Sequence, residues 1–169
     1  MSHPLAVIRP ARPEDVPEIF AMVGELASFE NLEHQLTASL DDMHQALFAQ
    51  QGHAEALVAE MPDADQRANV LVGYAIFFEN FSTFLCRRGI YLEDVYVRPS
   101  YRKRGIGSAF IRKLATFATE RKCGRMEWSV LDWNQNAIDL YEPIGGEVRP
   151  DWRIVRLNTD AIDLLAAGS

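Results

Sequence analysis

Three cationic residues and two glycines stand together where a predicted strand passes into a predicted helix. Arg102, Lys103 and Arg104 are followed by Gly105 and Gly107, and a helical pattern begins at the first glycine. At a helix N-terminus the backbone N–H groups point outward, the helix dipole attracts negative charge, and glycine lets a ligand approach closely. The turn therefore predicts an anion site, with a diphosphate as the obvious ligand. So short a pattern also fits a plain turn with a solvated basic face, and it is neither a Walker A loop nor a dinucleotide fingerprint.

Two adjacent carboxylates, Glu93 and Asp94, precede this turn on the same predicted strand. Neighbouring side chains of an ideal strand point to opposite faces, so only one of the two would meet a given ligand. A β-bulge, which is common near active sites, would let both contribute. An ordinary salt bridge is the alternative interpretation of Glu93.

A second pair, Asn134 and Tyr141, is seven residues apart on a predicted helix. This spacing is about two helical turns, so both side chains lie near one face. A phenol titrates near pH ~10 and can donate its proton at neutral pH. A core tyrosine with one hydrogen bond is the commoner fate of such a residue.

The elements that must position these residues follow from the hydrophobic periodicity. The almost wholly apolar run 69–79 predicts a central strand covered on both faces, and the order of the three middle strands implies antiparallel pairing. Strands are expected over 5–9, 54–60, 69–79, 90–97, 125–131 and 147–157, and helices over 12–29, 36–48, 105–121, 134–144 and 159–166. This order predicts one mixed-sheet α/β domain over residues 1–169.

Composition narrows the class of protein. The formal net charge of −7 argues against a dedicated nucleic-acid binder and is compatible with a cationic small molecule. Cys86 and Cys123 lack metal-ligand spacing and are interpreted as reduced thiols. Residues 1–10 carry no export signal and no apolar run is long enough to cross a bilayer, so we expect a cytoplasmic protein that contacts no membrane.

Longer segments resemble one family. The run from Arg102 to Gly107 resembles the acetyl-CoA signature of the GNAT acetyltransferase superfamily. The segments GIYLEDVYVRPSYR and EWSVLDWNQNAIDLYEPIGG resemble its spermidine/spermine (diamine) N-acetyltransferase branch, as do VIRPARPEDVPEI and ELASFE. The similarity runs from about Val7 to Arg156. It implies the GNAT acyl-CoA N-acyltransferase fold, with a mixed central sheet of about six to seven strands and helices on both faces, and it implies a homodimer.

The resemblance also implies a mechanism, in which an amine attacks the thioester of acetyl-CoA directly and no metal takes part. Glu93 would accept the amine proton through a water molecule, and the Tyr141 hydroxyl would protonate the departing thiolate. The residues expected to bind acetyl-CoA are Arg102, Lys103, Arg104, Gly105, Ile106, Gly107 and Ser108 at the pyrophosphate, the backbone of Val95, Tyr96 and Val97 on a splayed strand, and Asn134 with Tyr141.

The implied substrate is a small cationic amine, either a polyamine or diamine or a lysine-like amino acid such as thialysine. Carboxylates and aromatic rings suit an alkylammonium group. The residues expected to line its channel are Phe29, Glu30, Glu93, Asp94, Trp128 and Ser129. The alternative interpretation is that Phe29 is a core residue and Glu30 is exposed to solvent.

Two other functions stay open at this point: acetylation of a protein lysine or N-terminus, and a non-catalytic acyl-CoA-binding module. Tyr141 and Glu93 are both present, which argues against the second. Two residues depart from the family pattern. Lys103 stands where many relatives have glycine, and Pro143 is expected to end the helix of Tyr141 early. The region after Gly146 matches the family poorly.

Overall fold

A computed structural model describes residues 6–62 and 68–168. The chain forms two compact units, residues 1–129 and 130–169, which are described separately. The strands of the first unit are β1 (Val7–Pro10), β2 (Glu55–Pro62), β3 (Asn69–Ser82), β4 (Arg87–Val97) and β5 (Met126–Trp128). Its helices are η1 (Pro13–Asp15), α1 (Val16–Phe29), η2 (Glu33–Gln35), α2 (Leu40–Phe48), η3 (Pro99–Tyr101) and α3 (Ile106–Glu120). The second unit holds α4 (Gln135–Tyr141), η4 (Glu142–Ile144) and α5 (Thr159–Ala166).

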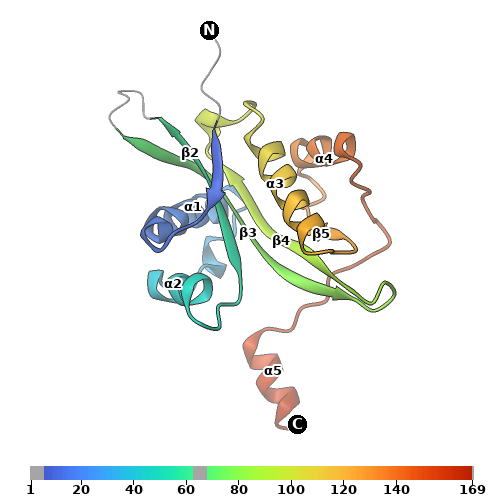
Figure 1. Ribbon diagram of the computed structural model, residues 1–169. Coiled ribbons are helices and arrows are strands. Elements are labelled where there is room, and N and C mark those ends of the chain that lie inside the picture. Colours follow the sequence, from blue (N-terminus) through green and yellow to red (C-terminus); the bar gives the residue numbers. More distant parts are fainter. Residues whose placement is uncertain (1–5, 63–67, 169) are drawn as a thin grey trace. The chain divides into compact units, whose positions relative to one another are not determined.

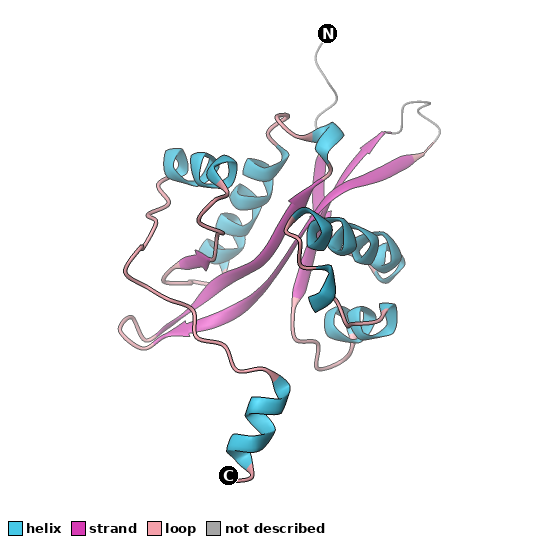
Figure 2. Ribbon diagram, turned by 180° about the vertical axis from the view of Figure 1, so that it is seen from behind, coloured by secondary structure: helices cyan, strands magenta, loops and turns pink. Residues whose placement is uncertain are grey.

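The sheet of the first unit runs in the order β1-β2-β3-β4-β5. The first three pairings are antiparallel and the last, between β4 and β5, is parallel. Helices α1 and α2 lie on one side of this sheet and α3 on the other (Figure 1). Seen from behind, the long strands β3 and β4 run side by side through the middle (Figure 2). The expected mixed α/β sheet with helices on both faces is confirmed, and β3 is its central strand because its apolar residues are covered on both sides.

The core beneath α1 lies on the face of the sheet that also carries the candidate site. Ile19 and Met22 of α1 are fully buried against residues of three strands: Val58, Tyr74, Ile76 and Tyr96. Burying an aliphatic side chain of this size stabilises the fold by ~1.5–3 kcal/mol. Arg98, directly after β4, anchors the helix further through ion pairs with Glu18 (2.6 Å) and Glu25 (2.8 Å).

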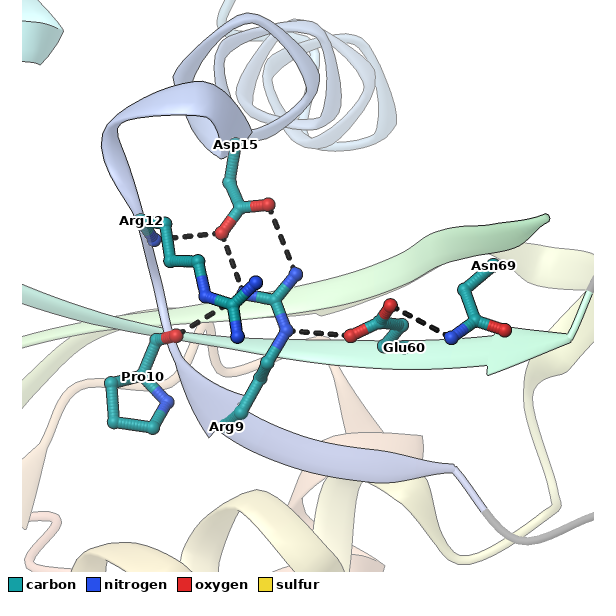
Figure 3. Close-up of polar contacts among 6 residues, drawn as sticks. All are labelled: Arg9, Pro10, Arg12, Asp15, Glu60 and Asn69. Carbon is teal, nitrogen blue, oxygen red and sulfur yellow. Dashed lines mark hydrogen bonds and ion pairs between the residues drawn. The ribbon is translucent and has the colours of Figure 1, made fainter.

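A polar network ties β1 to the start of α1 and to β2 (Figure 3). The Asp15 carboxylate accepts hydrogen bonds from Arg9 Nη1 (2.7 Å) and Nη2 (3.1 Å) and from the Arg12 backbone N–H (2.7 Å). Arg9 Nε also pairs with Glu60, which accepts a hydrogen bond from the Asn69 amide (2.9 Å). Burial tends to raise the pKa of Asp15, but the bonds from Arg9 and Arg12 outweigh it, and the pKa lies below its usual value.

The structure corrects the expected strand count. The sheet has five strands in the described ranges, because residues 147–157 form no strand. This segment was expected to be a strand because it is rich in β-type residues, yet Trp152, Ile154 and Val155 are exposed, and no described strand offers them a ladder of hydrogen bonds. Leu5, the expected start of the first strand, lies outside the described residues, as do residues 1–4.

Other boundaries have local causes. Helix α2 begins at Leu40 because Ser39 caps it, exchanging hydrogen bonds with Asp42. Helix α4 ends at Tyr141, two residues before Pro143, as that proline predicted. In the described part of the chain, no helix is long and apolar enough to cross a membrane. The prediction of a single domain over the whole chain stays a prediction.

Candidate active site

The turn between η3 and α3 has the backbone of an anion site. Gly105 is the N-cap of α3 and has φ 77°, a left-handed conformation that glycine adopts without steric cost. Lys103 also has a positive φ, 60°, which is uncommon for a residue other than glycine. No described side chain caps α3, so the N–H groups of Ile106, Gly107 and Ser108 at its first turn remain available to a ligand.

The cationic side chains of the turn are held by specific contacts. Arg102 Nε donates to the Val97 carbonyl oxygen (2.8 Å), and its guanidinium lies over the rings of Phe29 (5.1 Å) and Tyr96 (5.6 Å). Arg104 stacks on Tyr101 with 5.2 Å between the guanidinium carbon and the ring centroid. Arg102 therefore joins the predicted anion turn to the C-terminal end of α1.

Strand β4 leaves its outer neighbour before it reaches the turn. It pairs with β5 only over Ile90 to Leu92, opposite Met126 to Trp128. From Asp94 to Val97, within the described residues, it pairs only with β3. The edge of Val95, Tyr96 and Val97 that faces away from β3 is thus not covered by another described strand, as the expected splaying requires.

A β-bulge at Glu93 decides where the two carboxylates lie. Ile76 of β3 is opposite Asp94, and Phe77 is opposite Leu92. Glu93 therefore has no residue of β3 opposite it. Ile76 belongs to the core beneath α1, whereas the Phe77 ring packs against Phe117 of α3, with 6.0 Å between the two ring centroids. The extra residue places Asp94 on the α1 side, where regular alternation from Leu92 would have put it on the α3 side.

The charges of three carboxylates influence one another on this side of the sheet. Burial, together with the nearby charges of Glu93 and Glu30, raises the pKa of Asp94 to about 6. Glu30 caps the C-terminus of α1, and burial raises its pKa as well. No described cationic side chain forms an ion pair with Asp94, Glu93 or Glu30. Such an arrangement can bind an ammonium group and can accept a proton from it.

The remaining residues expected in the amine channel are placed differently. Phe29 is 43% exposed at the end of α1, beneath Arg102, so it is not a core residue. Ser129 shares a 2.8 Å hydrogen bond with the Tyr91 hydroxyl, near the carboxylates on β4. The Cα of Trp128 pairs with that of Leu92, so strand alternation directs its side chain to the α3 side, away from Glu93 and Asp94.

Asn134 and Tyr141 lie in the second unit, at the two ends of α4. The Asn134 side-chain oxygen accepts a hydrogen bond from the Ala137 N–H (3.3 Å) and caps the helix. Tyr141 is the last residue of the helix and is buried. Burial raises its pKa, so the hydroxyl stays protonated at neutral pH and able to donate.

Comparison with known proteins identifies the family. Residues 20–145 match the acetyltransferase (GNAT) family, which covers well over half of the chain. The chain belongs to the GNAT acetyltransferase family. It is therefore an acyl-transfer enzyme, and the resemblance noted in its sequence is confirmed.

Several relatives of this acetyltransferase act on small amines, according to their names. The chain is 36% identical over 164 residues to a thialysine N-epsilon-acetyltransferase of Mus musculus, covering 94% of this chain and 96% of the relative. It is 31% identical over 197 residues to an L-ornithine N5-acetyltransferase of Arabidopsis thaliana, covering 94% and 86%. A human spermidine/spermine N(1)-acetyltransferase-like protein 1 is 29% identical over 159 residues, covering 92% of this chain but 23% of the relative. Among solved structures, an integron cassette protein from the V. cholerae mobile metagenome shares the fold, with a TM-score of 0.76 at 22% identity over 96% of this chain and 98% of that one.

Sequence reasoning did not single out one buried polar group on the α1 side of the sheet. Tyr74 lies in the apolar run of β3, and its side chain is fully buried on the α1 side. Its hydroxyl has no hydrogen-bond partner among the described residues. No sequence signal marks it, because a tyrosine within an apolar strand is ordinarily a core residue.

Proposed function

We propose that this GNAT enzyme transfers an acetyl group from acetyl-CoA to the primary amine of a small cationic substrate. The substrate would be a polyamine or diamine, or a lysine-like amino acid such as ornithine or thialysine. The observation that carries the proposal is the cluster of Glu30, Glu93 and Asp94, which has no described cationic partner. The names of the relatives point to the same substrate class.

The turn before α3 fits the diphosphate of acetyl-CoA. A left-handed Gly105 opens the helix, the first N–H groups are uncapped, and the residues from Arg102 to Arg104 carry three positive charges and no negative one. Arg102 to Ser108 would hold the diphosphate, and the uncovered edge from Val95 to Val97 would hold the pantetheine arm. When bound, acetyl-CoA supplies an acetyl thioester, which is open to attack by a neutral amine.

The chain's own residues supply the two proton transfers that the reaction needs. The carboxylates bind the substrate ammonium, and Glu93, exposed on the bulge, accepts its proton through a water molecule. Tyr141, protonated at neutral pH, donates a proton to the thiolate that leaves. Asn134 contacts the pantetheine region from the start of α4. A homodimer in the cytoplasm is the expected form of the enzyme, and sedimentation should give about twice the 19.1 kDa of one chain.

A thiol-release assay with acetyl-CoA tests the proposal. The panel comprises spermine, spermidine, putrescine, L-ornithine, thialysine, lysine and a lysine-containing peptide. Release of CoA with one or more of the small amines, and little with the peptide, is the expected result. Release with the peptide alone would favour a protein acetyltransferase. Tight binding of acetyl-CoA without release with any amine would favour a non-catalytic binding module.

A further inference from the structure

The Tyr74 hydroxyl is a buried polar group that lacks a partner. The side chain is 0% exposed, its ring packs 6.2 Å from that of Tyr96, and no described atom accepts or donates a hydrogen bond at its oxygen. Tyr96 and Tyr91 differ, since their hydroxyls bond to Glu25 (3.1 Å) and to Ser129 (2.8 Å). Because an unpartnered hydroxyl in a core destabilises the fold, its presence calls for a ligand that restores the missing bond.

The surroundings of this hydroxyl are acidic. Tyr74 pairs with Tyr96 across β3 and β4, and Ile76 pairs with Asp94, so Tyr74 and Asp94 are diagonal neighbours on one face. After burial, the charges of Asp94 and Glu30 have the largest effects in raising the pKa of Tyr74. Asp94 forms no ion pair with a described cationic side chain.

The chemistry of these groups defines what they can bind. The ligand must be cationic to satisfy the carboxylates and must carry N–H donors for the carboxylate and phenol oxygens. A metal ion is disfavoured, because no group of three His, Cys, Asp or Glu side chains in the described ranges could hold one. A primary ammonium has three N–H donors on one small charged centre, whereas a trimethylated ammonium has the charge but no donor.

We propose that the Tyr74 hydroxyl and the Asp94 carboxylate form a socket for a primary ammonium of the substrate, and that Tyr74 selects primary over fully N-methylated amines. The inference rests on the proposed function and adds to it a specificity-determining residue. The bulge at Glu93 builds the socket by turning Asp94 to the side of Tyr74. The hydroxyl has no effect on charge and acts only through its hydrogen bond to the ammonium.

The test is Tyr74→Phe, which removes one oxygen atom and keeps the ring in the core. A hydrogen bond to a charged group corresponds to a change of roughly tenfold or more in affinity. We therefore expect the KM of the best amine among spermidine, L-ornithine and thialysine to rise about tenfold or more, with the KM of acetyl-CoA unchanged. The melting temperature without amine should stay the same or rise, because the variant no longer buries an unpartnered hydroxyl. Tyr101→Phe is the matched control. It should alter neither the amine KM nor the melting temperature, because the Tyr101 hydroxyl is outside the socket.

Binding of two monoamines tests selectivity without turnover. Thermal-shift titrations with butylammonium and butyltrimethylammonium chloride should show that the wild type binds butylammonium about tenfold or more tightly. In Tyr74→Phe, the difference between the two affinities should be smaller. Three results with Tyr74→Phe would contradict the proposed socket. These are an amine KM within twofold of the wild type, an unchanged ratio of the two affinities, or a clearly lower melting temperature. If the wild type acetylated no amine in the panel, the proposed function would fail, and the titrations would still decide whether the socket exists.

Discussion

Replacing Asp94 by asparagine should stabilise the protein at neutral pH and at the same time lower its activity. Burial, with the neighbouring charges of Glu93 and Glu30, raises the pKa of Asp94 from an ordinary value of 3.8 to about 6. At about 1.4 kcal/mol for each pH unit, the ionised carboxylate lowers the free energy of unfolding by roughly 3 kcal/mol. Asparagine has nearly the same shape and no charge, so the variant avoids most of this loss.

The pH dependence follows from the direction of the change. Because the folded protein holds the Asp94 proton more tightly than the unfolded chain, the loss of stability is absent below the unfolded pKa, about pH 4. It grows as the pH rises and is complete above the folded pKa of about 6. The stability difference between Asp94→Asn and the wild type should therefore be large at pH 7.5 and small at pH 4.

Thermal unfolding followed by circular dichroism, from pH 4 to pH 8, measures this difference. For a chain of this size, 3 kcal/mol corresponds to a rise in melting temperature of roughly 6–12 °C, which we expect at pH 7.5 without ligands. Asp163→Asn is the matched control: its side chain is exposed on α5, so its effect should be about 0.5 kcal/mol or less. Equal melting temperatures for wild type and Asp94→Asn at pH 7.5, or a gain that is just as large at pH 4, would refute the reasoning. In the thiol-release assay, Asp94→Asn should raise the amine KM by about tenfold or more.

Other parts of the site and fold give further predictions. Tyr141→Phe should lower turnover by ~10²–10⁴-fold with little change in acetyl-CoA binding, and an unchanged rate would remove Tyr141 as the general acid. Glu93→Gln should move the pH–rate profile towards higher pH, where more amine is already neutral, and an unaltered profile would point to another base. Arg102→Ala should raise the KM of acetyl-CoA about tenfold, less at high salt than at low salt, and equal effects at both would argue against an ionic contact. Asp15→Asn should lower stability at pH 7 by ~1–3 kcal/mol, because Arg9 loses its partner; since the pKa of Asp15 is lowered, this loss should shrink in acid, as denaturant titrations at pH 7 and pH 3 can measure.

Features of the fold that depend on nearby residues were predictable from the sequence. The apolar run of β3 predicted a central strand, Gly105 marked the start of α3, and Pro143 marked the end of α4. Each of these signals acts within a few residues, through burial on both faces of a strand, a left-handed turn, or the clash of a proline ring with the preceding turn. The anion turn belongs to the same class, because its cations and its helix start are adjacent in the sequence.

Features that depend on distant partners were not predictable in this way. Residues 147–157 have a strand-like composition, but a strand also needs a neighbour to complete its hydrogen bonds, and composition does not reveal one. The family resemblance implies that Trp128 and Ser129 line the same channel, whereas the parallel register with β4 directs their side chains to opposite sides of the sheet. Tyr74 looked like any other core aromatic, and only the fold shows that its hydroxyl is left without a partner beside Asp94.

The bulge at Glu93 links the stability of the protein to its chemistry. In a regular strand Asp94 would lie on the α3 side, and the α1 side would hold a single exposed carboxylate from β4. One extra residue brings Asp94 to the face that carries Tyr74, where burial and the charge of Glu30 oppose its ionisation and the Tyr74 hydroxyl is unpartnered among the described residues. Both effects destabilise the protein without substrate, and a primary ammonium relieves both when it binds. If the socket is correct, variants that stabilise the empty protein at these two positions must bind amine more weakly, because a single interaction accounts for both changes.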